Sequence, residues 1–181
     1  SELEELKKKS KKLNDDIERV VEEVLKRSED INERVKKEVK DVIDRNTDVL
    51  RRVKRDVERE DKSRELIRRL IEEIKKTTKE LEDRVRELVK ESEESVRRIE
   101  KLIRELIKES EKVVEEVKRT VSKGKEEAVR KVEKENRESV EKLKKAVKEV
   151  RDRNRKVIEE LKDLVRRSRD KSKKVVDELR K

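Results

Sequence analysis

The side chains best suited to chemistry in this 181-residue chain are amides and hydroxyls that interrupt a regular pattern of aliphatic residues. All five asparagines of the chain fall on positions where the pattern predicts an apolar residue. An amide or a hydroxyl both donates and accepts hydrogen bonds. Inside an apolar interior such groups select their partners by hydrogen bonding, so the pattern indicates recognition between helices.

Catalytic and metal-binding residue types are missing from the composition. The chain contains no His and no Cys, so it offers no general base that titrates near neutral pH, no thiol nucleophile and no His or Cys metal site. Adjacent carboxylates such as Glu22 and Glu23 are expected on wet helix faces, and no Gly-rich phosphate loop is present. We therefore expect no enzymatic activity, no cofactor, no metal and no small-molecule substrate.

The composition fits two kinds of chain, and the spacing of apolar residues decides between them. Charged residues make up 60% of the chain and apolar residues 29%, which suits either a disordered segment or a long helix. Apolar residues recur every three or four positions over 3–57, 66–121 and 128–179. This spacing predicts amphipathic helices.

The helical pattern repeats every 18 residues. Leu13, Ile31 and Val49 are successive equivalents, as are Leu143 and Leu161. Eighteen residues in five turns is the period of a straight α-helix, whereas a seven-residue repeat imposes a supercoil. The sequence therefore predicts straight helices with little supercoil.

Two interruptions divide the pattern into three helices. The first lies at Glu60 and Asp61, after which either Asp61 or Ser63 can cap the next helix. The second is the stretch 122–125, where Gly124, the only glycine, suits a left-handed residue that closes a helix.

The expected fold is all-α. Helices of about 2–60, 63–121 and 125–180 form a straight, antiparallel three-helix bundle, because short loops make neighbouring helices antiparallel. We expect residues 1–181 to form a single elongated bundle, alone or as part of a four-helix assembly.

Folding the chain at its two turns places the polar residues at shared heights. Residue i of the first helix lies level with residue 124 − i of the second and 122 + i of the third. This predicts three buried polar layers: Asn14 with Ser110 and Asn136, Asn32 with Ser92 and Asn154, and Asn46 with Thr78 and Ser168. Neighbouring hydroxyls can extend the layers: Ser10, Ser28, Thr77, Ser95, Ser139 and Ser172.

The layers are interpreted as devices that fix the helix register. A buried polar group without a partner costs about 1–3 kcal/mol, so any sliding that separates the partners is penalised. Valine and leucine alone tolerate a shift by one turn, whereas matched amides do not. The alternative is that these residues merely dilute the core or lie at its wet edge.

The net charge of +10 invites a nucleic-acid hypothesis. Both signs are interspersed along the chain, and no aromatic residue is available to stack on a base or to anchor a helix in a membrane surface. We expect no specific nucleic acid and no membrane as partner, and only weak, salt-sensitive binding to polyanions as a remote alternative.

The stretches SELEELKKKS, KSRELIRRLIEEI and VSKGKEEAVRKVEKENRESVEKL resemble computationally designed helical bundles. Uniform helices, minimal loops, Glu/Lys/Arg surfaces and an aliphatic core with planned polar layers carry the resemblance, which covers the whole chain. It implies a man-made protein without a substrate. Some such designs are heterodimers that split a four-helix bundle into three helices plus one.

The resemblance and the residues leave two partner hypotheses open. Either the three helices need no partner, or they receive a helix from a designed partner chain or associate with themselves. Each apolar stripe spans an arc of about 120–140°, which is wide enough for a fourth helix to be credible.

Overall fold

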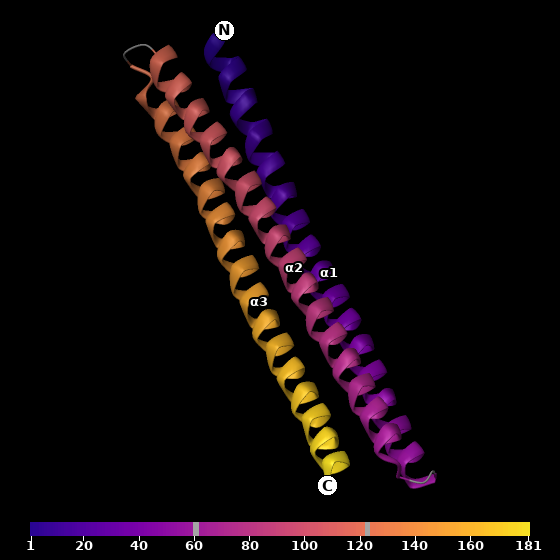
Figure 1. Ribbon diagram of the computed structural model, residues 1–181. Coiled ribbons are helices and arrows are strands. Elements are labelled where there is room, and N and C mark those ends of the chain that lie inside the picture. The colour runs from indigo at the N-terminus through magenta and orange to yellow at the C-terminus, as the bar shows by residue number, and fades with distance from the viewer. Residues whose placement is uncertain (60–61, 122–123) are drawn as a thin grey trace. The chain divides into compact units, whose positions relative to one another are not determined.

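The computed structural model describes residues 1–59, 62–121 and 124–181, and all secondary structure over these residues is helical. The three helices are α1 (Glu2–Arg59), α2 (Arg64–Thr120) and α3 (Glu126–Arg180), as Figure 1 shows. Each described helix end lies within one residue of the end expected from the apolar pattern.

Serine hydroxyls cap two of the helix starts. Ser1 Oγ accepts a hydrogen bond from the backbone N–H of Glu4 at 3.3 Å. Ser63 Oγ accepts one from the N–H of Leu66 at 3.1 Å, which selects Ser63 as the cap of α2. The other candidate, Asp61, lies outside the described residues, as do Glu60, Ser122 and Lys123 of the two interruptions.

Gly124 has the positive φ that its position in the sequence predicts, but it has a different role. Its φ is +104°, a region that only glycine adopts readily. The last residue of α2 is Thr120 and the first of α3 is Glu126, so Gly124 does not close α2. It lies in a turn just before α3.

Replacing Gly124 by alanine is expected to lower the free energy of unfolding by about 1 kcal/mol through backbone strain. A Cβ at this position meets no atom within 4 Å, so steric clash adds nothing. Thermal unfolding of Gly124→Ala and of Gly124→Asn, which tolerates positive φ better, checks this. Equal stability of the alanine variant and the parent chain would contradict the assignment.

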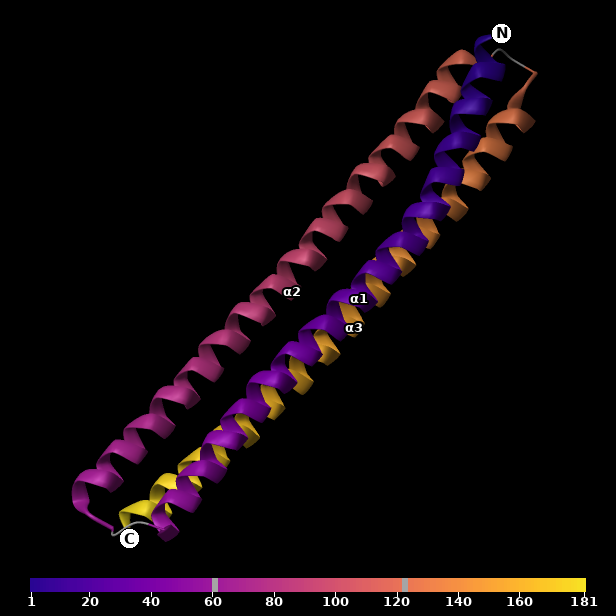
Figure 2. The same ribbon diagram turned by 90° about the vertical axis from the view of Figure 1, so that its right-hand side faces the viewer.

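Contacts between residues group the chain into two compact units, and each unit contains a segment of every helix. The first unit comprises residues 1–30 and 94–154, and the second comprises residues 31–93 and 155–181. Within each unit the three segments lie side by side (Figures 1 and 2). Each unit is therefore a three-helix bundle.

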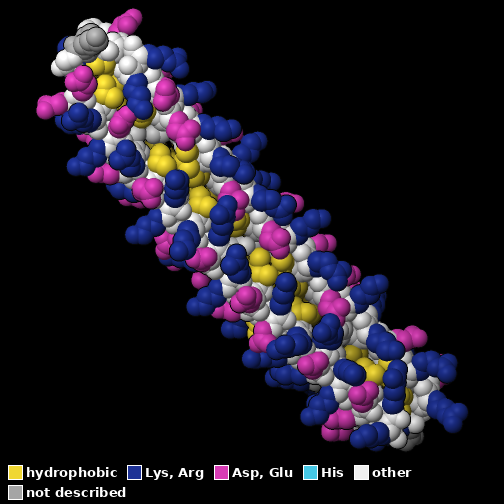
Figure 3. All heavy atoms as spheres, turned by 90° about the vertical axis from the view of Figure 1, so that its left-hand side faces the viewer, with side chains coloured by type: hydrophobic (Ala, Val, Ile, Leu, Met, Phe, Trp, Pro, Cys, Tyr) yellow, Lys and Arg dark blue, Asp and Glu magenta, His cyan; other side chains and the backbone are white. Residues whose placement is uncertain are grey.

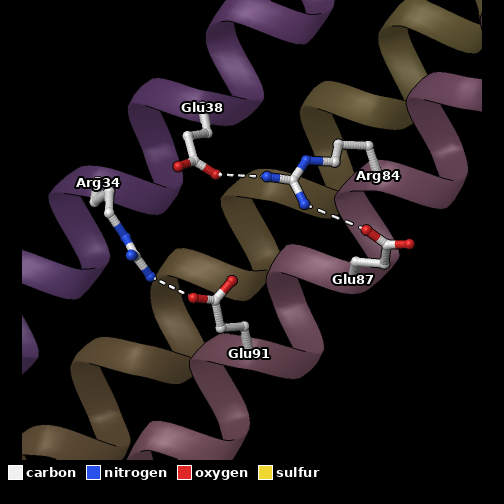
Figure 4. Close-up of polar contacts among 5 residues, drawn as sticks. All are labelled: Arg34, Glu38, Arg84, Glu87 and Glu91. Atoms are coloured by element: carbon white, nitrogen blue, oxygen red, sulfur yellow. Dashed lines mark hydrogen bonds and ion pairs between the residues drawn. The ribbon is translucent and has the colours of Figure 1, made fainter.

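Ion pairs give the direction of the segments in each unit. In the second unit Arg34 contacts Glu91 and Glu38 contacts Arg84, so the residue number falls in α2 as it rises in α1 (Figure 4). In the first unit Lys9 contacts Glu116, which gives the same pairing of residue i with residue 125 − i as Arg34 and Glu91. This register is one residue from the expected 124 − i.

The third helix runs parallel to the first in both units. Glu18 contacts Lys142 in the first unit, and Lys36 contacts Glu160 in the second. Both pairs join residue i to residue i + 124, two residues from the expected offset of 122. Helices that follow each other in the chain are therefore antiparallel within each unit, as predicted.

Each unit has an aliphatic core built from the predicted stripes. In the first unit one continuous cluster includes Ile17, Ile103 and Leu143. In the second unit the core consists of two separate clusters, one around Leu88 and Leu161 and the other around Leu50, Leu70 and Val175. Side chains between these two clusters form the best-defined polar layer of the protein.

Candidate functional site: the buried polar layers

The polar layer of the second unit joins all three helices through Asn46. Its amide nitrogen Nδ2 donates to Ser168 Oγ and to Ser172 Oγ of α3, both at 3.1 Å. Its carbonyl oxygen Oδ1 accepts from Thr77 Oγ1 of α2 at 3.3 Å. Asn46, Ser168 and Ser172 are buried, so these hydrogen bonds form where water does not compete.

Helical spacing places this layer between the two apolar clusters of the second unit. On α1, Asn46 lies between Val39 of one cluster and Leu50 of the other. On α3, Ser168 and Ser172 lie between Leu161 and Val175. The amide and the hydroxyls thus occupy one cross-section of the unit, with aliphatic side chains on either side.

The threonine that reaches this layer is Thr77, and the prediction of Thr78 is corrected. Thr78 Oγ1 donates to the backbone carbonyl of Ile74, in its own helix, at 2.7 Å. Consecutive residues of a helix point about 100° apart, so only one of the two hydroxyls can face α1. Thr77 Oγ1 lies 3.1 Å from the Ile74 carbonyl oxygen and 3.3 Å from Asn46 Oδ1, so its single proton is shared between these two acceptors.

The polar layer of the first unit is only partly paired. Ser10 Oγ of α1 donates to Asn136 Oδ1 of α3 at 3.2 Å, and both residues are 2% exposed. Two other buried polar atoms, Asn14 Oδ1 and Asn136 Nδ2, have no hydrogen-bond partner in the described residues. One is an acceptor and the other a donor, so they are complementary groups on the two helices predicted to present them.

The serines assigned to this layer lie near the two asparagines. Ser110 of α2 is buried and lines a surface groove together with Asn136. Ser139 of α3 is buried and lines another groove together with Asn14, which is half-buried. The apolar cluster of this unit is continuous, so this layer does not divide the core as the Asn46 layer does.

The residues assigned to the middle layer are divided between the units. Asn32 and Ser92 belong to the second unit, and Asn154 and Ser95 belong to the first. Asn32, Ser92 and Asn154 are buried, Ser95 is half-buried, and the neighbouring Ser28 of the first unit is buried. Ser92 and Asn154 each have an interaction partner. The direct pairing of this layer stays a prediction.

Opposite charges on the surface reinforce the register of the first unit. Arg151 Nε of α3 donates to Glu100 Oε1 of α2 at 2.8 Å, and the Glu100 side chain is 20% exposed. This hydrogen bond lowers the pKa of Glu100 below its ordinary value of 4.5 and raises the pKa of Arg151. In the same way, the hydrogen bond to Glu133 raises the pKa of Lys118.

The lowered pKa of Glu100 predicts a pH effect below pH 4.5. The folded state favours the carboxylate, so the pair stabilises the fold above the unfolded-state pKa, and this stability is lost as pH falls through the lower folded-state pKa. We expect Arg151→Gln to raise the Glu100 pKa toward 4.5, measured by NMR titration of the Glu100 carboxyl carbon. Arg153→Gln, which leaves this pair intact, is the control, and an unchanged pKa in Arg151→Gln would contradict the assignment.

Residues 1–59, 62–121 and 124–181 contain neither a metal-binding cluster nor a membrane-spanning helix. No group of three or more Asp or Glu side chains among them could hold a metal ion. None of the described helices combines the length and the apolar character needed to cross a membrane.

Comparison with known proteins gives a likeness in fold. No protein-family model and no curated protein matches the chain. A solved structure described as a computationally designed three helix bundle matches with a TM-score of 0.55 and 17% sequence identity. The match covers 98% of this chain and 90% of that one. The chain therefore resembles a designed three-helix bundle in fold.

Proposed function

We propose that the chain is a designed structural protein whose buried Asn, Ser and Thr layers set the register and pairing of its helices. The Asn46 layer carries this proposal. One amide accepts from α2 and donates twice to α3. A shift of α2 by one turn, about 5.4 Å, separates Asn46 from Thr77, and a shift of α3 by one turn leaves Asn46 with one of its two serine partners.

The physical reason lies in the asymmetry between paired and unpaired polar groups. Paired hydrogen bonds add little net stability, whereas a buried group left without its partner costs about 1–3 kcal/mol. An aliphatic core gives no such penalty, because valine packs against valine in any register. The layers thus support a role in specifying one arrangement, and the chain is proposed to act as a scaffold.

The double variant Asn32→Leu plus Asn154→Leu tests this role. We expect helicity to stay unchanged while the register or the oligomeric state becomes heterogeneous. Spin labels at residues 36 and 160, which form an ion pair across α1 and α3, report the register as a distance distribution. Light scattering reports departure from the 21.9 kDa mass of one chain.

The matched control exchanges Thr47, whose hydroxyl bonds only within its own helix, for valine. We expect one narrow distance population in the parent chain and in this control, and a broadened one in the double variant. An unchanged distance distribution and an unchanged mass in the double variant would contradict the proposal.

A second candidate function is an interaction module that receives a helix from another chain. A groove between α2 and α3 of the second unit favours it, because aliphatic side chains line the hollow between the two helices. Figure 3 views the molecule from the side on which α3 lies in Figure 1, and apolar side chains are visible there between the charged ones.

A further inference from the structure

The groove between α2 and α3 of the second unit is long and narrow. Two adjoining hollows, of about 400 Å³ and about 290 Å³, share Glu82 and Arg169 and so form one channel. Its aliphatic lining consists of the half-buried Val89 and Val165 and of Ile74, Val85 and Val176, which are buried at its base. The hydroxyl residues Thr78 and Ser172 lie among them.

The lining residues recur at helical spacing on both walls. They extend from residue 74 to residue 89 on α2 and from residue 162 to residue 180 on α3. At 1.5 Å per residue the channel is about 22–27 Å long. Such a length matches four or five turns of a helix and exceeds what a compact small molecule fills.

The edges of the channel are strongly basic. Eight Lys and Arg side chains line it against two carboxylates, Glu82 and Asp177. Three of the cations belong to α2 and five belong to α3, so both walls carry the same sign. Like charges that face each other across a groove repel, and the repulsion is relieved by an anionic partner.

The contact between α2 and α3 in the second unit differs from the other helix–helix contacts of the two units in its ion pairs. Opposite charges join α2 to α3 in the first unit, through Lys118 with Glu133 and Arg151 with Glu100. At least one ion pair also joins α1 to α2 and α1 to α3 in each unit. The described residues that line the channel form no ion pair across it.

We propose that this channel is the docking site for an acidic amphipathic helix of another chain. The partner helix presents aliphatic residues to the channel floor and Glu or Asp residues to both basic edges. The proposal deepens the second candidate function, on which it rests, by assigning the face that receives the helix and the charge of the partner.

The floor of the channel favours a helix over a nucleic acid. A polyanion makes ionic contacts with the basic edges but buries no apolar surface on the aliphatic floor. The chain also has no aromatic residue on which a base could stack. Charge also disfavours a second copy of this chain, because its net charge of +10 opposes docking on a basic edge.

Binding of synthetic helical peptides of about 20 residues to the full chain tests the proposal. One peptide carries an aliphatic stripe flanked by Glu, and the matched peptide carries the same stripe flanked by Lys. By fluorescence anisotropy we expect the acidic peptide to bind about tenfold or more tightly than the basic one, with an affinity that falls as salt rises.

Two charge-reversed variants locate the binding. Lys79→Glu, Arg169→Glu and Lys173→Glu together reverse the channel edge, whereas Lys40→Glu, Arg45→Glu and Arg55→Glu make the same change in net charge on exposed positions of α1. We expect the first triple variant to bind the acidic peptide about tenfold or more weakly than the parent chain does. The second is expected to change this affinity by less than about threefold. The first variant removes like-charge repulsion, so its thermal stability is expected to equal or exceed that of the parent.

Other occupants give different results and overturn the proposal. The channel is a polyanion site if a polyglutamate peptide or a single-stranded oligonucleotide binds as tightly as the acidic helix. In that case Val89→Ser plus Val165→Ser leaves the affinity for the polyanion unchanged. A dimer of the parent chain that the channel variant dissociates identifies a second copy. Absence of acidic-peptide binding, or equal weakening by the two triple variants, also refutes the proposal.

A failure here is separable from a failure of the proposed structural role. The peptide experiment reads an intermolecular affinity and leaves the asparagines untouched. The Asn32 and Asn154 experiment reads an intramolecular distance without any peptide. A negative result in the peptide experiment therefore does not affect the outcome of the asparagine experiment, and the reverse is also true.

Discussion

Replacing Leu161 by alanine is expected to lower the free energy of unfolding by about 2–5 kcal/mol. Leu161 is completely buried in the second unit, where it packs in one cluster with Leu88 and Val157. Removing its isobutyl group forfeits apolar burial and leaves a cavity, because surrounding valines relax only partly. Urea unfolding followed by circular dichroism measures the change.

Leu164 provides a matched control three residues away in the same helix. It is the same residue type but 39% exposed, so Leu164→Ala is expected to cost less than about 1 kcal/mol. Both substitutions change helix propensity equally. The difference between their losses in the free energy of unfolding therefore measures the effect of burial. Equal losses for the two variants would show that Leu161 does not lie in the core.

The burial of Leu161 could be predicted from the sequence, whereas the exposure of Leu164 could not. The 18-residue repeat aligns Leu161 with Leu143, and both are completely buried in their units. Leu164 lies off this line, at the edge of a stripe that is wider than the arc three helices cover. Which edge of a wide stripe is covered depends on how each helix rotates about its axis, and apolar spacing does not determine that rotation.

The same limit explains which polar contacts could be predicted. Asn46 and Ser168 were expected at one height and are hydrogen-bonded, because height depends only on the rise per residue and the place of the turns. The choice of Thr77 over Thr78 depends on helix rotation. In the first unit, Asn136 pairs with Ser10, one turn before Asn14. Ser10 and Asn14 lie on the same face of α1, and their shared height does not determine which of the two reaches Asn136.

The basic channel was not recognised from the sequence, although its residues are all visible there. Lys75, Lys79 and Arg86 are scattered among carboxylates along α2, so the run of charge along the chain looks mixed. The positive charge of the channel edges is recognisable only when α2 and α3 lie side by side and their facing edges are compared. A count of charges at the edges of each apolar stripe, in place of a count along the chain, would have revealed it.

Removing the amide of Asn46 alone is expected to cost about 1–3 kcal/mol. Asn46→Leu keeps a side chain of similar size but leaves the hydroxyls of Ser168 and Ser172 buried without their donor. Thr77 keeps its bond to the Ile74 carbonyl and contributes less to the loss. The neighbouring control Thr47→Val removes a hydroxyl that bonds only within α1, and it is expected to change stability by less than about 1 kcal/mol.

Replacing every polar residue of the Asn46 layer is expected to restore the stability that Asn46→Leu alone removes. The quadruple variant changes Asn46→Leu, Thr77→Val, Ser168→Ala and Ser172→Ala, so no polar group of the layer stays buried and the two apolar clusters of the second unit can merge. Exchanging a complete polar set for apolar groups is often neutral or stabilising, and we expect stability within about 1 kcal/mol of the parent or above it. A quadruple variant less stable than Asn46→Leu would mean that the hydrogen bonds stabilise the fold directly. A single variant as stable as the parent would mean that the pairing does not constrain the helices.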